Sequence, residues 1–116
     1  MVNEGMAGKM VSEHVIRVVC DETLIDPYYV YAYLSTEKIG KILLEKGIYA
    51  SVVDHITPSF VATIPIPRLN LEKEKKIADK IREAEKKRDE ANSIFMEERN
   101  KIENLIFENM KKKTNE

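Results

Sequence analysis

Residues 71–110 read LEKEKKIADKIREAEKKRDEANSIFMEERNKIENLIFENM, and this stretch decides how the rest of the chain is organised. It contains no proline and no glycine, and it is rich in Lys, Glu, Ala and Ile, all of which helices tolerate. At about 1.5 Å per residue, one helix from Leu71 to Lys113 would be about 60 Å long, which is more than the width of a small domain. The stretch therefore predicts a single long helical arm attached to a small body.

Along this arm, apolar residues recur in alternating steps of four and three, which is the heptad spacing of coiled coils. These residues form a narrow apolar seam on an otherwise charged helix. Packing of this seam against the small body of the same chain would stabilise the helix too little. We therefore expect a partner helix, with a lone solvated helix as the alternative. The positions expected at the dimer interface are Ile77, Ile81, Ala84, Arg88, Ala91, Phe95, Glu98, Ile102 and Leu105.

The polar members of the seam favour an antiparallel homodimer. A parallel pair would stack Arg88 on Arg88 and Glu98 on Glu98, whereas an antiparallel pair sets Arg88 of one copy against Glu98 of the other. A small residue near the middle of the seam, Ala91, lets the two helix axes approach closely. We expect the copies to cross near Ala91, with Ile77 of one copy near Leu105 of the other.

Length and composition limit the remaining possibilities. The 116 residues suit one domain with an extension, and 19 Lys and Arg nearly balance 20 Asp and Glu. The overall charge is not basic and so does not indicate nucleic-acid binding, although a local basic patch can still bind nucleic acid. The single cysteine, Cys20, cannot form an internal disulfide, and no apolar run suits a membrane span or a signal peptide. We therefore expect a soluble cytoplasmic protein.

The residues before the arm combine strand and helix signals. The β-branched run His14–Cys20 predicts a strand, and Asp26 followed by a proline predicts a helix start. A second helix, capped by Ser35 or Thr36, is expected to end at Gly47, unless the two helices are one helix with a bend.

Further along, the pair Val52–Val53 suggests a short strand and the pair Thr57–Pro58 predicts a short helical turn. The segment Ile64–Pro67 predicts an extended edge, because its prolines lack amide donors. We therefore predict an α/β (α+β) body over residues 1–70 and a coiled-coil arm over residues 71–113. The expected core of the body consists of Val15, Val18, Tyr29, Val30, Leu34, Ile39, Leu43 and Phe60.

The sequence contains no catalytic or metal-binding pattern. His14 and His55 lack a metal-ligand spacing, and together with Cys20 they are too few for a zinc site. Cys20 lies in a predicted strand, where a buried structural thiol is more common than a nucleophile. Tyrosines near position 30 could stack on bases, but their helical spacing favours a core position for Tyr29 and Tyr33. We expect a protein that is not an enzyme by itself and that uses no cofactor or metal.

The order of these elements resembles a known family. A strand, the helical stretch DPYYVYAYLSTEKIGKILLEKG, the segment YASVVDHITPSFVATIPIP and a charged helix containing EAEKKRDEA follow one another between residues 11 and 108. This order is similar to the C-terminal half of a target recognition domain, with its helical spacer, in the specificity subunit of type I restriction–modification systems. The matching segments are Pro27–Leu34, Ala50–Val53 and Ile64–Pro67.

The resemblance implies a non-catalytic subunit that recognises double-stranded DNA and holds methyltransferase and restriction subunits. It implies DNA contacts from the recognition domain, for which the candidates are Lys38, Lys41, Tyr49, Ser51, His55 and Arg68. Lysine and arginine can hold phosphates or guanine edges, while tyrosine, serine and histidine can donate hydrogen bonds or stack. From chemistry alone, the lysines are more often a solvated face. The alternative function is a coiled-coil fragment that binds protein only.

Overall fold

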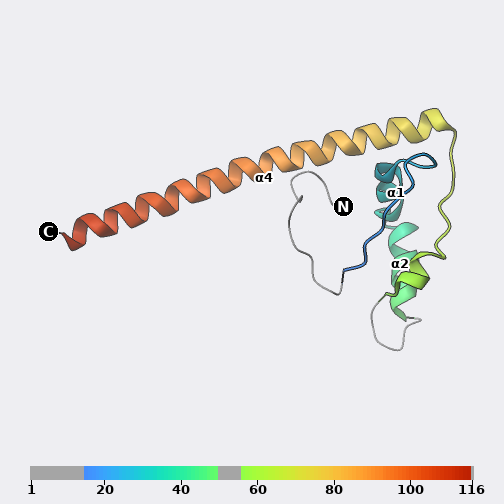
Figure 1. Cartoon of the computed structure of the whole chain (residues 1–116), viewed down its shortest axis with the longest axis horizontal. Coiled ribbons are helices and arrows are strands. Elements are labelled where there is room, and N and C mark those ends of the chain that lie inside the picture. The colour runs from blue at the N-terminus through green and yellow to red at the C-terminus, as the bar shows by residue number, and fades with distance from the viewer. Residues whose placement is uncertain (1–14, 50–55, 116) are drawn as a thin grey trace. The chain divides into compact units, whose positions relative to one another are not determined.

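The computed structural model describes residues 15–49 and 56–115, and every regular element among them is a helix. In chain order these are α1 (Pro27–Leu34), α2 (Gly40–Tyr49), α3 (Pro58–Val61) and α4 (Leu71–Thr114) (Figure 1). The prediction of an α/β body is therefore wrong, since the described part of the chain is helical and contains no strand.

The expected strand is not formed, because no other strand among the described residues lies beside it. Residues 15–20 have no regular secondary structure, and Val15 and Val18 are both 55% exposed. No backbone hydrogen bond from these residues is found within the described ranges. A β-branched sequence favours a strand only where another strand accepts its backbone groups. The second expected strand, at Val52–Val53, lies outside the described residues.

Helix α1 begins as its sequence predicts. The Oδ1 atom of Asp26 accepts a hydrogen bond from the amide of Tyr28 at 2.8 Å, and proline occupies the first helical position. The helix ends at Leu34 and is capped by Ser35, whose amide donates to the carbonyl of Tyr31. Its buried residues are Tyr29 and Val30, so this side of α1 packs against neighbouring parts of the chain.

Helix α2 is separate from α1, and the alternative of one bent helix is not observed. The hydroxyl of Thr36 accepts a hydrogen bond from the amide of Gly40 at 2.9 Å, so Thr36 supports the helix start. A Cβ atom on Gly40 would clash with the carbonyl of Tyr33, and one on Gly47 would clash with the ring of Phe60. Gly47 does not end the helix; it lies within it, where the missing side chain lets α3 approach closely.

Helix α3 is the predicted short turn. The hydroxyl of Thr57 accepts from the amide of Phe60 at 3.3 Å, and the helix stops at Val61. The chain then passes through Ile64–Pro67 without regular structure. There the phenol of Tyr29 donates a 2.6 Å hydrogen bond to the carbonyl of Pro67, which fastens this segment to α1.

The expected core is only partly correct. Tyr29 and Val30 are buried, and three other members of the expected core are half-buried: Leu34, Leu43 and Phe60. Val15, Val18 and Ile39 are exposed, contrary to the prediction. The two valines were assigned to the core because a sheet was expected, so their exposure follows from the absence of a strand in the described residues.

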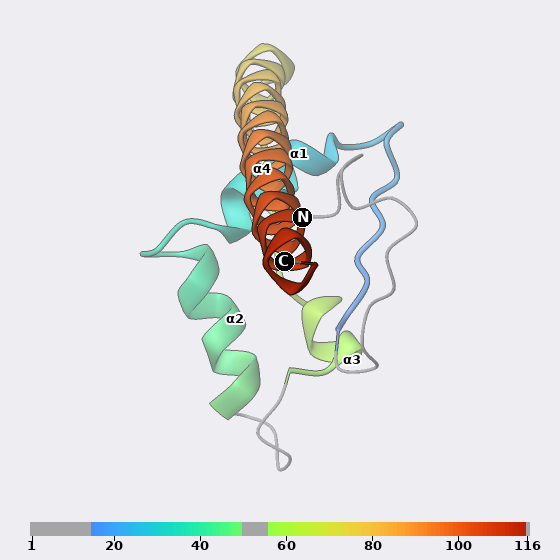
Figure 2. The same cartoon turned by 90° about the vertical axis from the view of Figure 1, so that its left-hand side faces the viewer.

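Helix α4 is one uninterrupted helix of 44 residues, as predicted, and Figure 2 looks along it. It begins after Asn70, whose side-chain oxygen accepts from the amide of Lys73 at 2.9 Å. The chain divides into two compact units, Met1–Glu83 and Ala84–Glu116, and the division falls within α4. The first turns of α4, called the root here (residues 71–83), therefore belong to the same unit as α1, α2 and α3.

Candidate functional site

A buried carboxylate organises the start of the root. The side chain of Glu74 is 4% exposed and accepts hydrogen bonds from Nε and Nη2 of Arg68 at 2.8 and 2.9 Å. It also accepts from the amide of Leu69 at 2.9 Å. The hydrogen bonds from Arg68 lower the pKa of Glu74 below its usual value, against the opposing effect of desolvation. Glu74 thus fixes the turn that leads into α4.

A second cluster ties the root to the start of α1. Nη2 of Arg82 donates to Oδ2 of Asp26 at 2.8 Å, and Nη1 donates to Oδ1 of Asp79 at the same distance. The guanidinium also lies 4.6 Å from the centre of the Tyr28 ring. The hydrogen bond with Asp26 is the main reason that the pKa of Arg82 is raised. Asp26 and Arg82 are 56 residues apart, so local sequence patterns gave no signal for this contact.

These contacts lie on one side of the root. Glu74, Ala78 and Arg82 are spaced by four residues and therefore share a helix face. Ala78 is fully buried, at 0% exposed. The heptad seam runs beside this face: Ile77 is 36% exposed and Ile81 is half-buried. The root accordingly carries both a docked face and the first part of the predicted interface.

Beyond the root, the arm presents its apolar side chains to solvent. We call the apolar residues of this part the distal face, and each is between 45% and 66% exposed: Ile94, Phe95, Met96, Ile102, Leu105, Ile106, Phe107 and Met110. The distal face includes three predicted interface positions, Phe95, Ile102 and Leu105, and is wider than the predicted seam. A helix with an apolar stripe of this width is typical of one that packs against another element.

The remaining predicted interface positions are also accessible. Ala84 and Ala91 are exposed. Arg88 is 62% exposed and donates to Glu85 at 2.7 Å, while Glu98 accepts from Lys101 at 2.8 Å.

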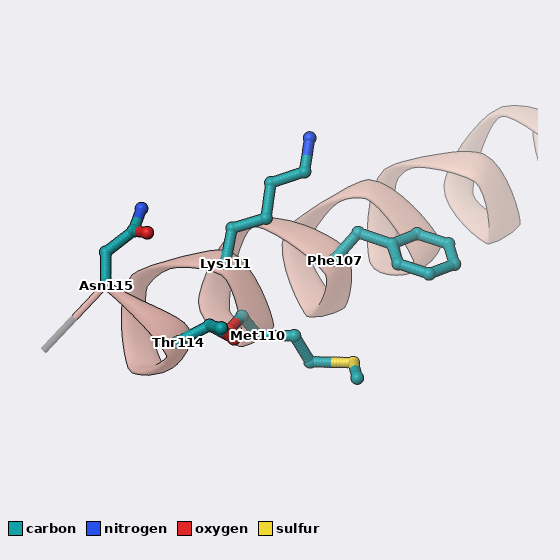
Figure 3. A pocket seen from close by; sticks show the side chains of 5 residues that line it. All are labelled: Phe107, Met110, Lys111, Thr114 and Asn115. Carbon is teal, nitrogen blue, oxygen red and sulfur yellow. The ribbon is translucent and has the colours of Figure 1, made fainter.

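At the end of the arm, a hollow of about 380 Å³ lies between side chains of the last turns of α4 (Figure 3). Its lining consists of Phe107, Met110, Lys111, Thr114 and Asn115. Because four of the five lie on α4 and Asn115 directly follows it, the hollow is a surface that lacks an opposite wall in the described residues. It continues the distal face.

The residues proposed for DNA contact are only partly brought together. Lys38 lies in the turn before α2 and Lys41 in the first turn of α2, and both are exposed and have no ion pair within the described ranges. Tyr49 is the last residue of α2. Arg68 lies at the root, and its guanidinium is held by Glu74 although the side chain remains 49% exposed. Ser51 and His55 lie outside the described residues.

The described residues include no cluster of three or more His, Cys, Asp or Glu side chains able to hold a metal ion. Burial, followed by the charges of Asp26 and Glu22, raises the pKa of the Cys20 thiol, which disfavours the reactive thiolate. A shallow cavity of about 440 Å³ beside the root is lined by acidic and basic side chains that mostly bind one another, including Asp26, Arg68, Glu74, Asp79 and Arg82. In the part of the chain described, no helix is both long and apolar enough to cross a membrane.

Comparisons with protein-family models, with curated proteins and with solved structures found no match in any of the three. The features that bear on function are therefore the arm, its junction with α1 and the exposed lysines at α2.

Proposed function

We propose that the chain forms part of the DNA-binding specificity subunit of a type I restriction–modification system. In this role α4 is the helical spacer, and the unit containing α1 to α3 belongs to a target recognition domain. The partners are double-stranded DNA and the methyltransferase and restriction subunits, and the location is the cytoplasm. The chain contributes recognition and scaffolding, while catalysis resides in its partners.

The observation that carries this proposal is the continuous helix α4 with its exposed distal face. A helix of 44 residues has far more surface than α1 to α3 can cover, and its apolar side chains remain exposed along the last turns. Pairing with a second helix would remove these side chains from water, at roughly 25 cal/mol for each Å² of apolar surface buried. A spacer that holds two recognition domains requires this kind of arm.

We infer that the second helix is α4 of another copy, in antiparallel orientation. The antiparallel register that pairs Arg88 with Glu98 crosses near residue 93, so it is shifted by four residues from one that would pair Ile77 with Leu105. In this register, Phe95 and Ile102 face the small residues Ala91 and Ala84 of the second copy. A large side chain opposite a small one fills each layer without overlap. The same register places Arg88 opposite Glu98 of the second copy. Arg88 is 62% exposed and binds Glu85 within its own chain.

For DNA, the support comes from Lys38 and Lys41. Both are exposed near the start of α2 and have no ion pair within the described ranges, so their charges are available to phosphates. Arg68 is a weaker candidate because its guanidinium already forms two hydrogen bonds with Glu74.

The test is salt-dependent retention of the full chain on duplex DNA. Replacing both lysines in Lys38→Glu/Lys41→Glu should weaken retention and flatten its dependence on salt, because fewer counterions are released. Lys112→Glu/Lys113→Glu is the matched control, since it makes the same charge change at the end of the arm, outside the hollow. Equal retention of the parent and the Lys38/Lys41 variant would contradict a DNA-binding role for these residues.

A protein-only function is the second candidate, and the distal face favours it by itself. A coiled-coil fragment could pair with another helix through α4 without contacting DNA. In that case the chain would form dimers or bind an intact specificity subunit, and it would show no salt-dependent retention on duplex DNA.

A further inference from the structure

Helix α1 is too short to be stable by itself. It has eight residues, whereas isolated helices shorter than about 12–15 residues are marginal in water. Only two of its residues are buried. Its order must therefore depend on the elements that hold it, among which the root of α4 makes the most specific contacts.

Asp26 links the start of α1 directly to α4. Its Oδ1 atom caps α1 through the amide of Tyr28, and its Oδ2 atom accepts from Arg82 on α4, each at 2.8 Å. One carboxylate thus serves both helices. Arg82 is positioned for this bond, and over the Tyr28 ring, only when α4 is helical through residue 82. Formation of the α1 cap and formation of the root therefore favour each other.

A second connection runs through the segment that precedes α4. Tyr29 of α1 holds the carbonyl of Pro67, and the next residue, Arg68, is bound by Glu74 on the first turns of α4. Burial raises the pKa of Tyr29, so its phenol stays protonated and able to donate. Loss of helical structure in the root would release both connections to α1 at once.

The stability of α4 depends in turn on its distal face. The helix is strongly charged, and beyond the root its apolar residues are exposed. Pairing of two arms would bury them and stabilise the helix along its length, because helix formation is cooperative.

We propose that pairing of the arms and ordering of α1 are thermodynamically coupled, with Asp26–Arg82 and Arg68–Glu74 as the links. The inference rests on the arm pairing of the proposed function, but it is independent of DNA binding. Arg82 acts here as a positioning residue: it transmits the state of α4 to the cap of α1. A paired arm would thus hold α1 ordered, and an unpaired arm would let it open.

Hydrogen exchange of the α1 amides, measured on the full chain alongside sedimentation, tests this coupling. Dilution below the dimer dissociation constant should accelerate α1 exchange. The variant Ile102→Asp, which introduces a charge into the distal face, should do the same at high concentration. We expect acceleration of about tenfold, equivalent to roughly 1.4 kcal/mol in the free energy of local opening.

The local link is tested with Arg82→Gln, which should accelerate α1 exchange to a similar extent while the protein stays dimeric. Lys76→Gln is the matched control, since it breaks an exposed ion pair with Glu72 on the same turns and should leave α1 unchanged. If Arg82→Gln proves unfolded by circular dichroism, Asp26→Asn replaces it, because asparagine keeps the cap of α1 and removes the charge facing Arg82.

Three results would overturn the coupling. A monomeric Ile102→Asp protein with α1 exchange at the parent rate would show that pairing does not reach α1. Unchanged α1 exchange in a folded Arg82→Gln or Asp26→Asn protein would remove the proposed link. A parent that sediments as a monomer at every concentration would overturn the arm pairing of the proposed function as well, and so would be distinguishable from the other two.

Discussion

The root and the distal part of α4 are built from similar residues, yet they meet different surroundings. In the root, Glu74 and Ala78 are buried and Arg82 binds a carboxylate on α1. In the distal part, apolar residues such as Phe95 and Ile102 are more than half exposed. One continuous helix thus carries similar side chains in both buried and exposed positions. What differs is burial: Ala78 in the root is fully buried, whereas the apolar residues of the distal face are largely exposed.

The largest expected contrast comes from removing an aromatic side chain on each side of this comparison. Tyr29→Ala removes a buried ring that contacts the segment before the root, and it should lower the free energy of unfolding by about 3–5 kcal/mol. Phe95→Ala removes an exposed ring, and in the monomer it should change stability by no more than about 0.5 kcal/mol.

Chemical denaturation at a protein concentration below the dimer dissociation constant measures both values. A large loss of stability for monomeric Phe95→Ala would mean that the distal face is covered within one chain. A Tyr29→Ala protein as stable as the parent would remove Tyr29 from the core.

The local signals for helix starts and for the long helix were reliable, whereas Gly47 did not end α2 as predicted. The caps formed by Asp26 and Thr57, each followed by proline, predicted the starts of α1 and α3, and the long run without proline or glycine predicted α4. The strand expected at His14–Cys20 was wrong over its described residues, because a strand depends on a neighbour that no local pattern specifies.

The contacts that join α1 to the root and to the segment before it were not predicted, for the same physical reason. The contacts of Tyr29 with Pro67 and of Asp26 with Arg82 join residues 38 and 56 positions apart, and Arg82 by itself resembles any charged residue on a solvated helix. A carboxylate that caps one helix can use its second oxygen elsewhere, but nothing in the sequence near Asp26 names the partner.

Cysteine cross-linking tests how the partner helix is oriented along the distal part of α4. In a Cys20→Ser background, Ala91→Cys should cross-link readily with a short bis-maleimide, since its two copies are offset by only about 6 Å along the axis near the crossing point of the antiparallel pair. Ile77→Cys should not, because its copies would be separated by roughly 50 Å of helix. Efficient disulfide formation at Ile77 on a non-reducing gel would indicate a parallel pair, and a monomer by light scattering would exclude the dimer.

The smallest expected effect concerns acid stability, and it separates the buried carboxylate of the root from an exposed one further along the arm. The pKa of Glu74 is lowered in the folded protein, mainly by the hydrogen bonds from Arg68. A group whose folded pKa lies below its unfolded value stabilises the fold fully above the unfolded pKa, here near 4.5, and loses that contribution as the pH falls through the folded value. The parent should therefore lose stability on acidification below about pH 5.

Glu74→Gln should be less stable at pH 7 and should show a shallower decline, because no carboxylate remains there to be protonated. Glu98→Gln removes the same charge from an exposed pair with Lys101 and serves as the control. Measured below the dimer dissociation constant, where Glu98 faces no second copy, its decline should be close to that of the parent. Denaturation midpoints measured from pH 7 to pH 3.5 give the two slopes. If Glu74→Gln declined as steeply as the parent, Glu74 would not hold the root in the way its contacts with Arg68 and Leu69 indicate.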